Sequence, residues 1–193
     1  LEKTGSFSCN DELINQLQHN IVWGQKGNFL DVPTDCPQRD ERLGWTGDAQ
    51  VFAPTASFNM DCAGFYHEWL KDLAADQHED GAIPWVVPNV LGRGAAHGWA
   101  DAGVIVPWVV YRYYGDTTIL QQQYESMKGW VEFVRSQSGD SYLWKPTERQ
   151  FGDWLAFATT RSDYPGATTD KDLLATAYFY HSTSLLQKTA LIL

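Results

Sequence analysis

The sequence predicts an all-α protein, an α/α toroid of about three helical hairpins. Three observations lead to this fold class. Apolar residues recur at helical spacing through most of the chain. An amphipathic helix is followed three times by a loop and then by a more uniformly apolar helix. No stretch shows a strand pattern of consequence, although residues 83–87 and 141–144 could each pair briefly within a loop.

The first hairpin begins with a helix that Asn10 or Ser8 can cap. This helix ends near residues 24–27, and its apolar residues keep helical spacing at Leu13, Ile14, Leu17 and Ile21. After a loop, a second helix is expected from Asp48 to Met60, apolar on several faces. Pro54 should kink this second helix or mark a late start.

The second hairpin starts with a helix from about Asp61 to His78. Its apolar side carries Phe65, Trp69, Leu70 and Leu73. A loop rich in glycine and proline follows over residues 81–98. Residues 102–114 are then nearly all apolar, which predicts a helix buried all round although it contains Pro107.

The third hairpin starts at Asp116, which is expected to cap a helix with apolar residues at Leu120, Tyr124, Met127, Val131 and Val134. A long loop covers residues 138–168. Thr169 with Asp172 resembles a capping box for the last helix. That helix is expected to bury Leu173, Leu174, Ala177, Tyr178 and Leu185.

Each of the three loops carries a glycine, an aromatic residue and an acid near the start of its apolar helix. The clusters are Gly44–Trp45 with Asp48, Gly98–Trp99 with Asp101, and Gly152–Asp153–Trp154. If the hairpins have outer and inner members, the inner helices start at one rim and the clusters gather there. Three hairpins would be half of a six-hairpin barrel. The alternative is an open α-solenoid, whose repeats are shorter and more uniform.

The composition excludes some classes of partner. A formal net charge of -10 argues against nucleic acid, which would need clustered lysine and arginine. The longest apolar run, residues 104–111, is too short to cross a bilayer, so no membrane segment is expected. The cysteines show no CxxC spacing and are expected to be free thiols: Cys9, Cys36 and Cys62. Because both ends look cut, residues 1–193 are interpreted as a piece of a longer protein.

The strongest chemical signal lies in residues 31–48, a segment that prolines and glycines keep out of regular structure. It contains five acids with two arginines between them: Asp31, Asp35, Asp40, Glu41, Asp48, Arg39 and Arg42. Glycoside hydrolysis needs one protonated carboxyl and a second carboxylate, and a cluster of like charges can keep one acid protonated. We interpret the segment as an active-site loop that also offers an aromatic face to a sugar. The alternative is a salt-bridged surface loop.

Other chemistries fit these residues less well. The acids lack EF-hand spacing, and the arginines between them would repel calcium. The histidines form no HxxxH or HExxH pair, although His97 could line a cleft or face solvent. No metal or other cofactor is therefore expected. Acids around Cys36 should raise the pKa of its thiol, which favours a packed thiol over a nucleophile.

Residues 35–48, Asp-Cys-Pro-Gln-Arg-Asp-Glu-Arg-Leu-Gly-Trp-Thr-Gly-Asp, closely resemble the signature loop of the α-L-rhamnosidases of glycoside hydrolase family 78. Residues 98–101 and 152–154 fall where that family has further sugar-site aromatics. The resemblance implies an (α/α)6 barrel and a carbohydrate substrate, with terminal α-L-rhamnose hydrolysed by inversion. By position, Glu41 matches the general acid. Sugar binding is expected of Asp35, Arg39, Trp45, Asp48, Trp99, Asp101 and Trp154.

The resemblance also puts the general base, a glutamate, in the second half of the barrel, where this chain has no matching position. Residues 1–193 are therefore expected to be the N-terminal part of one catalytic domain, inactive alone. Apolar surface left open by the missing half should cause self-association. Two further functions stay open: a non-catalytic carbohydrate-binding α/α domain, and a related six-hairpin glycosidase with another substrate.

Overall fold

The computed structural model describes residues 1–92, 94–156 and 169–193. Over these residues the chain forms α1 (Glu12–Asn28), α2 (Thr46–Asn59), α3 (Ala63–Asp76), α4 (Ala102–Tyr114), α5 (Thr117–Ser138), the short 3-10 helix η1 (Gly139–Ser141) and α6 (Lys171–Ile192). Strand-like pairing within the described ranges is limited to isolated bridges, one of them between Trp45 and Val86. The all-α prediction is confirmed.

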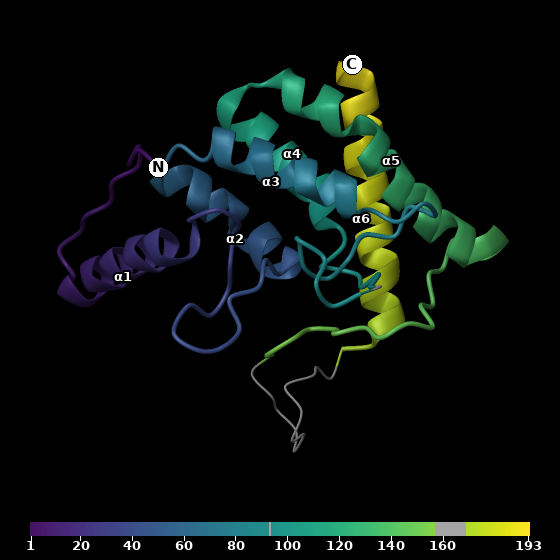
Figure 1. Cartoon of the computed structure of the whole chain (residues 1–193), viewed down its shortest axis with the longest axis horizontal. Helices are drawn as coiled ribbons and strands as arrows, with labels where there is room; N and C mark the ends of the chain where they lie inside the picture. The colour runs from purple at the N-terminus through teal and green to yellow at the C-terminus, as the bar shows by residue number, and fades with distance from the viewer. Residues whose placement is uncertain (93, 157–168) are drawn as a thin grey trace.

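Helix α4 lies at the centre of the packing (Figure 1). It contacts α2, α3, α5 and α6. Its core residues Val104, Val106 and Val110 are fully buried, and Pro107 is accommodated inside the helix. The bounds of α4 are those expected from the sequence, but it is not buried all round, because Arg112 and Tyr113 in its last turn are exposed.

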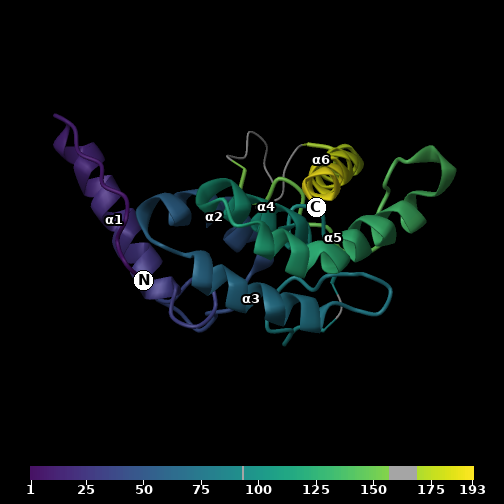
Figure 2. The same ribbon diagram turned by 90° about the horizontal axis from the view of Figure 1, so that it is seen from above.

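Side-chain amides of helix α1 form hydrogen bonds with α2. The buried Gln25 donates from Nε2 to the Ala56 carbonyl at 3.2 Å, and Gln18 donates to Asn59 Oδ1 at 2.9 Å. Leu13 and Leu17, which mark the apolar side of α1 in the sequence, are 81% and 57% exposed. Figure 2 shows α1 at one edge of the molecule, away from α4, α5 and α6. The apolar side of α1 is therefore largely open.

Some helix starts differ from the predicted ones because a different aspartate reaches the free amides. Asp11, and neither Asn10 nor Ser8, caps α1 through a bond from the Leu13 amide at 2.9 Å. Asp170 caps α6, accepting from the Leu173 amide at 2.9 Å. The expected capping box of Thr169 and Asp172 does not form the cap. The cap at Asp116 is confirmed.

The buried side of helix α6 matches the predicted one only in part: Leu185 is buried as expected, and Leu174 and Tyr178 are half-buried. Leu173 is 64% exposed and Ala177 is also exposed, contrary to expectation. The buried side consists of Ala175, Phe179, Ser182, Leu185 and Thr189. Polar residues on that side obscure the apolar pattern in the sequence. In the described part of the chain, none of the helices has both the length and the apolar character needed to span a bilayer.

The three predicted loops lead into α2, α4 and α6, and Figure 1 shows their described parts on the same side of the helices. Residues 157–168 of the third loop lie outside the described residues. The inner helices of the hairpins thus begin at one side of the protein, as the repeat predicted.

Candidate active site

The loop between α1 and α2 is closed at its base by two hydrogen bonds. The Asp35 amide donates to the Leu43 carbonyl, and the Leu43 amide donates to Asp35 Oδ1, each at 3.0 Å. The Gly44 carbonyl then accepts from the Val87 amide at 2.9 Å. A Cβ at Gly44 would lie 2.0 Å from the Val87 carbonyl oxygen, so only glycine permits this approach. The first and second loops are therefore joined through their backbones.

Glu41 is held within this loop by two donors. The Trp45 indole donates to Oε1 at 2.9 Å, and Arg39 donates from Nε to Oε2 at 2.9 Å, with Nη2 at 2.8 Å. A carboxylate oxygen of Glu41 lies within 4.8 Å of one of Asp35. Because the side chains of Arg39 and Glu41 are 60% and 28% exposed, water screens this ion pair.

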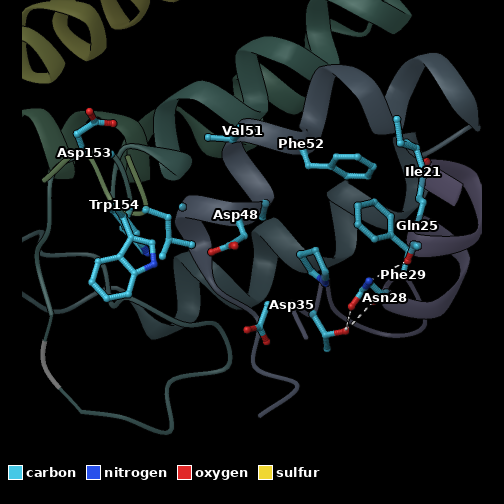
Figure 3. A pocket seen from close by; sticks show the side chains of 18 of the residues that line it. Ile21, Gln25, Asn28, Phe29, Asp35, Asp48, Val51, Phe52, Asp153 and Trp154 are labelled. Atoms are coloured by element: carbon cyan, nitrogen blue, oxygen red, sulfur yellow. Dashed lines mark hydrogen bonds between the residues drawn. The ribbon is translucent and has the colours of Figure 1, made fainter. Parts of the chain in front are cut away.

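A cavity of about 640 Å³ lies beside the loop (Figure 3). Asp35 of the loop and Asp48 of the first turn of α2 lie on its wall. The second loop contributes Trp99 and the third contributes Trp154. In Figure 3, Trp154 lies on one side of Asp48, and side chains of α1 and the start of the first loop lie on the other. Residues far apart in the sequence thus meet at one concave surface.

The position of Asp48 changes its acidity. Burial against the cavity wall raises the pKa of its carboxyl, and the negative charges of Asp35 and Glu41 raise it further. Asp48 is nevertheless exposed to solvent on the open side of the cavity, which limits the effect of this burial. A carboxyl that keeps its proton to higher pH can donate a hydrogen bond to a sugar hydroxyl.

Trp99 lies against the first turn of α2. A Cβ at Gly47 would come within 2.7 Å of the indole atoms Cδ2 and Cε2. Such an approach is tolerated only because position 47 has no side chain. The aromatic wall therefore lies directly on the backbone next to Asp48.

Asp101 and His97 lie beneath the cavity and are absent from its wall. Asp101 is 1% exposed, and its Oδ2 accepts from the Gly98 amide at 2.8 Å. Its Oδ1 accepts from Trp130 Nε1 at 2.9 Å and from Ser182 Oγ at 2.5 Å. These donors occupy the carboxylate, so the structure does not bring Asp101 to a sugar.

His97 is likewise 1% exposed and neither lines the cavity nor faces solvent, contrary to both expectations for it. Burial lowers the pKa of its imidazole. His97 therefore belongs to the support of the cavity.

The three cysteines are free, as expected. Partial burial and a hydrogen bond to Asp35 raise the pKa of the Cys36 thiol, in the direction predicted for a thiol among acids. Asp35, Cys36 and Glu41 are also the one group of potential metal ligands within the described ranges. The guanidinium of Arg39 already binds Glu41 there, which opposes a cation at the same place.

Several cavity residues were not predicted as site candidates, among them Tyr178 and Asp153. Tyr178 of α6 was expected to be a core residue, yet it lines the cavity, and burial raises the pKa of its phenol. Its place in an apolar helical pattern gave no sign of this. Asp153 also lines the cavity. Its signal was present in the third glycine, aromatic and acid cluster.

The helical hairpins, whose inner helices begin at a cavity of acids and tryptophans, have the arrangement expected of an α/α toroid. The sequence profile of the bacterial alpha-L-rhamnosidase six-hairpin glycosidase domain matches residues 2–193. The chain belongs to this family, and the resemblance found in its sequence is confirmed.

Known relatives agree with this assignment. An alpha-L-rhamnosidase of Formosa agariphila is 46% identical over 194 residues, covering 99% of this chain and 20% of the relative. The crystal structure of native alpha-L-rhamnosidase from Aspergillus terreus superimposes with a TM-score of 0.92 at 43% identity, covering 98% of this chain and 22% of that one. The crystal structure of Streptomyces avermitilis alpha-L-rhamnosidase complexed with L-rhamnose superimposes with a TM-score of 0.86 at 47% identity. This match covers 97% of this chain and 17% of that one. This chain thus spans about a fifth of the length of such relatives.

Proposed function

We propose that this chain is part of the catalytic domain of a glycoside hydrolase that releases terminal α-L-rhamnose. Glu41 is the proposed general acid. Asp35 and Asp48 bind the sugar hydroxyls, and Trp99 and Trp154 cover its apolar face and its 6-deoxy methyl group. Arg39 and Trp45 complete the site from the side of the loop.

One observation carries this proposal. Asp35 and Asp48 share a cavity wall with Trp99 and Trp154, and Glu41 lies within 4.8 Å of Asp35. Acids supply hydrogen-bond partners for hydroxyls, and aromatic faces cover the C–H face of a pyranose. The substrate follows from the family, since the relatives matched above are alpha-L-rhamnosidases and one was solved with L-rhamnose.

The proposed reaction is an inverting hydrolysis. Glu41 protonates the oxygen of the leaving group, while a base on the other face of the sugar activates water. The two carboxyl groups of such a pair stand about 6.5–9.5 Å apart. We propose that the base comes from a part of the domain outside residues 1–193. On this proposal, the 193-residue chain alone does not turn over.

The arginine bound to Glu41 sets a requirement on this mechanism. A general acid must reach the oxygen of the leaving group, and Arg39 contacts Glu41 Oε2 at 2.9 Å in this structure. The Arg39–Glu41 ion pair is partly exposed and screened by water, so breaking it costs little free energy. A sugar hydroxyl of the substrate can then bind Arg39 in place of Glu41. Binding of substrate thereby frees Glu41 Oε2 for the leaving group.

The test is Glu41→Gln in the full-length protein, assayed on two rhamnosides. With an alkyl alcohol as leaving group, we expect kcat to fall by about 10²–10⁴-fold, the usual contribution of a general acid. With an activated phenol, which leaves without protonation, the loss is expected to be much smaller. The matched control is Asp40→Asn, because the neighbouring Asp40 side chain is fully exposed. Turnover within tenfold of wild type on the alkyl rhamnoside would remove Glu41 from this role.

A carbohydrate-binding module is the second candidate function. Both oxygens of Glu41 are occupied by Trp45 and Arg39, an arrangement that also suits a loop kept only for recognition. A full-length protein that binds L-rhamnose and hydrolyses no rhamnoside would favour this function. A panel of other aryl glycosides separates a rhamnosidase from a six-hairpin glycosidase with another substrate.

A further inference from the structure

Phe151, in the third loop, is surrounded by tryptophans. Its ring centroid lies 4.5 Å from that of Trp99, 5.3 Å from Trp85, 5.6 Å from Trp154 and 5.9 Å from Trp45. The contacts with Trp45, Trp85 and Trp154 are edge-to-face, a favourable geometry for aromatic pairs. Tryptophans from all three loops thus meet at one phenylalanine.

We propose that Phe151 is the positioning residue of this site, fixing the sugar-facing tryptophans and the tryptophan that holds the general acid in one arrangement. The inference rests on the proposed function. It concerns a residue that the sequence pattern had left among the loop residues.

The backbone at Phe151 is itself well anchored. Gln150 accepts from the His97 amide at 2.8 Å and donates from Nε2 to the Ala95 carbonyl at 3.0 Å. Lys171, in the first turn of α6, donates to the Gln150 carbonyl at 2.8 Å. The third loop is therefore bound to the second loop and to α6 immediately before Phe151. A ring held in this way can constrain the rings around it.

Phe151 acts through other residues and touches no sugar. It is 4% exposed and does not line the cavity, whereas Trp99 and Trp154 do. On its other side, Trp45 carries the indole that donates to Glu41 Oε1. A change in the packing of Phe151 therefore reaches both the sugar-facing wall and the acid.

Phe151→Leu tests this role, because leucine keeps an apolar side chain and loses the planar ring. The matched control is Phe133→Leu. Phe133 is 5% exposed and packs on Trp130 with ring centroids 5.6 Å apart, in α5 and away from the cavity wall. Both variants are made in the full-length protein, and their stability, near-ultraviolet circular dichroism and dissociation constant for L-rhamnose are measured.

We expect Phe151→Leu to raise the dissociation constant for L-rhamnose about tenfold or more, since a displacement of about 1 Å in a site is costly. Phe133→Leu, at a similar loss of stability, is expected to change it less than about twofold. Equal affinity of Phe151→Leu and wild type would overturn the proposal. So would an equal loss of affinity in both variants.

Two outcomes need a further comparison. If Phe151→Leu does not fold, Phe151→Tyr is measured instead, because tyrosine keeps the aromatic ring. A dissociation constant for L-rhamnose close to that of wild type then supports the proposal, and a tenfold higher one overturns it. If the wild-type protein neither binds nor hydrolyses rhamnosides, the proposed function fails on its own. The tryptophan circular dichroism still tests Phe151, because a signal unchanged in Phe151→Leu would contradict its positioning role.

Discussion

The contact between Gly47 and Trp99 predicts that a single added methyl group will impair the site. In Gly47→Ala the new Cβ would lie 2.7 Å from the indole ring. Carbon atoms pack best at about 3.5–4.0 Å, so the ring must retreat by about 1 Å. A displacement of that size in a binding site can cost about 10²-fold in activity. In the full-length protein, we therefore expect kcat/KM on an aryl rhamnoside to fall by about one to two orders of magnitude.

The effect on stability should be smaller than the effect on activity. Alanine is favoured over glycine in a helix by about 1 kcal/mol, whereas overpacking costs about 1–3 kcal/mol. The net loss in the free energy of unfolding is thus about 0–2 kcal/mol, measured by urea denaturation. Gly64→Ala is the matched control, because Gly64 is also the second residue of a helix and nothing lies within 4 Å of its added Cβ. It should leave activity unchanged and stability equal or higher.

A double variant isolates the steric cause. In a Trp99→Leu background the added methyl group at position 47 meets no indole, so Gly47→Ala should have little further effect on kcat/KM. The two substitutions are then strongly non-additive. If Gly47→Ala retains full activity, or if its effect is the same with and without Trp99, the steric reasoning is refuted.

Three further outcomes are expected. The pKa of Asp48 is raised in the folded protein, so above about pH 3.8 the folded state binds more protons than the unfolded chain. The free energy of unfolding therefore decreases as the pH rises above that value. Asp48→Asn should therefore increase the free energy of unfolding at pH 7 and lose this advantage below pH 3.8; the same gain in the control Asp40→Asn would contradict this cause. At pH 8 a thiol reagent should react fastest with the exposed Cys9, more slowly with Cys36 and slowest with the buried Cys62, whose pKa is raised to about 11. Rapid labelling of Cys62 in the folded chain would contradict its burial. The isolated 193-residue chain should self-associate through its open apolar side chains, and Leu13→Glu should weaken this in sedimentation velocity; a compact monomer of the unmodified chain would count against it.

The sequence predicts the helices best where one side of the helix is uniformly apolar. Helix α4 is recognisable because almost every residue is apolar, and α5 because a capping aspartate precedes a regular spacing. Helix α6 is harder, since its buried side includes Ser182 and Thr189. Their contacts with distant residues, such as the bond from Ser182 to Asp101, cannot be inferred from a local pattern.

The same limit applies to the candidate site. The acids and tryptophans were identifiable from their types and from their place before inner helices. Residues far along the chain determine whether an acid faces a cavity or already accepts hydrogen bonds from neighbouring donors. Asp101 illustrates this, because Trp130 and Ser182 lie 29 and 81 positions away. Phe151 was missed for a related reason, as its significance comes from four rings scattered over three loops.

The donors to Asp101 also have a consequence for the order of folding. As the chain is synthesised from its N-terminus, the Gly98 amide is available at once, the Trp130 indole only with α5, and the Ser182 hydroxyl only with α6. Burial of the carboxylate before its last donor arrives is unfavourable, so the turn that carries Trp99 matures when α6 docks. A chain that ends before α6 would therefore be helical, but the wall of its cavity would not have formed.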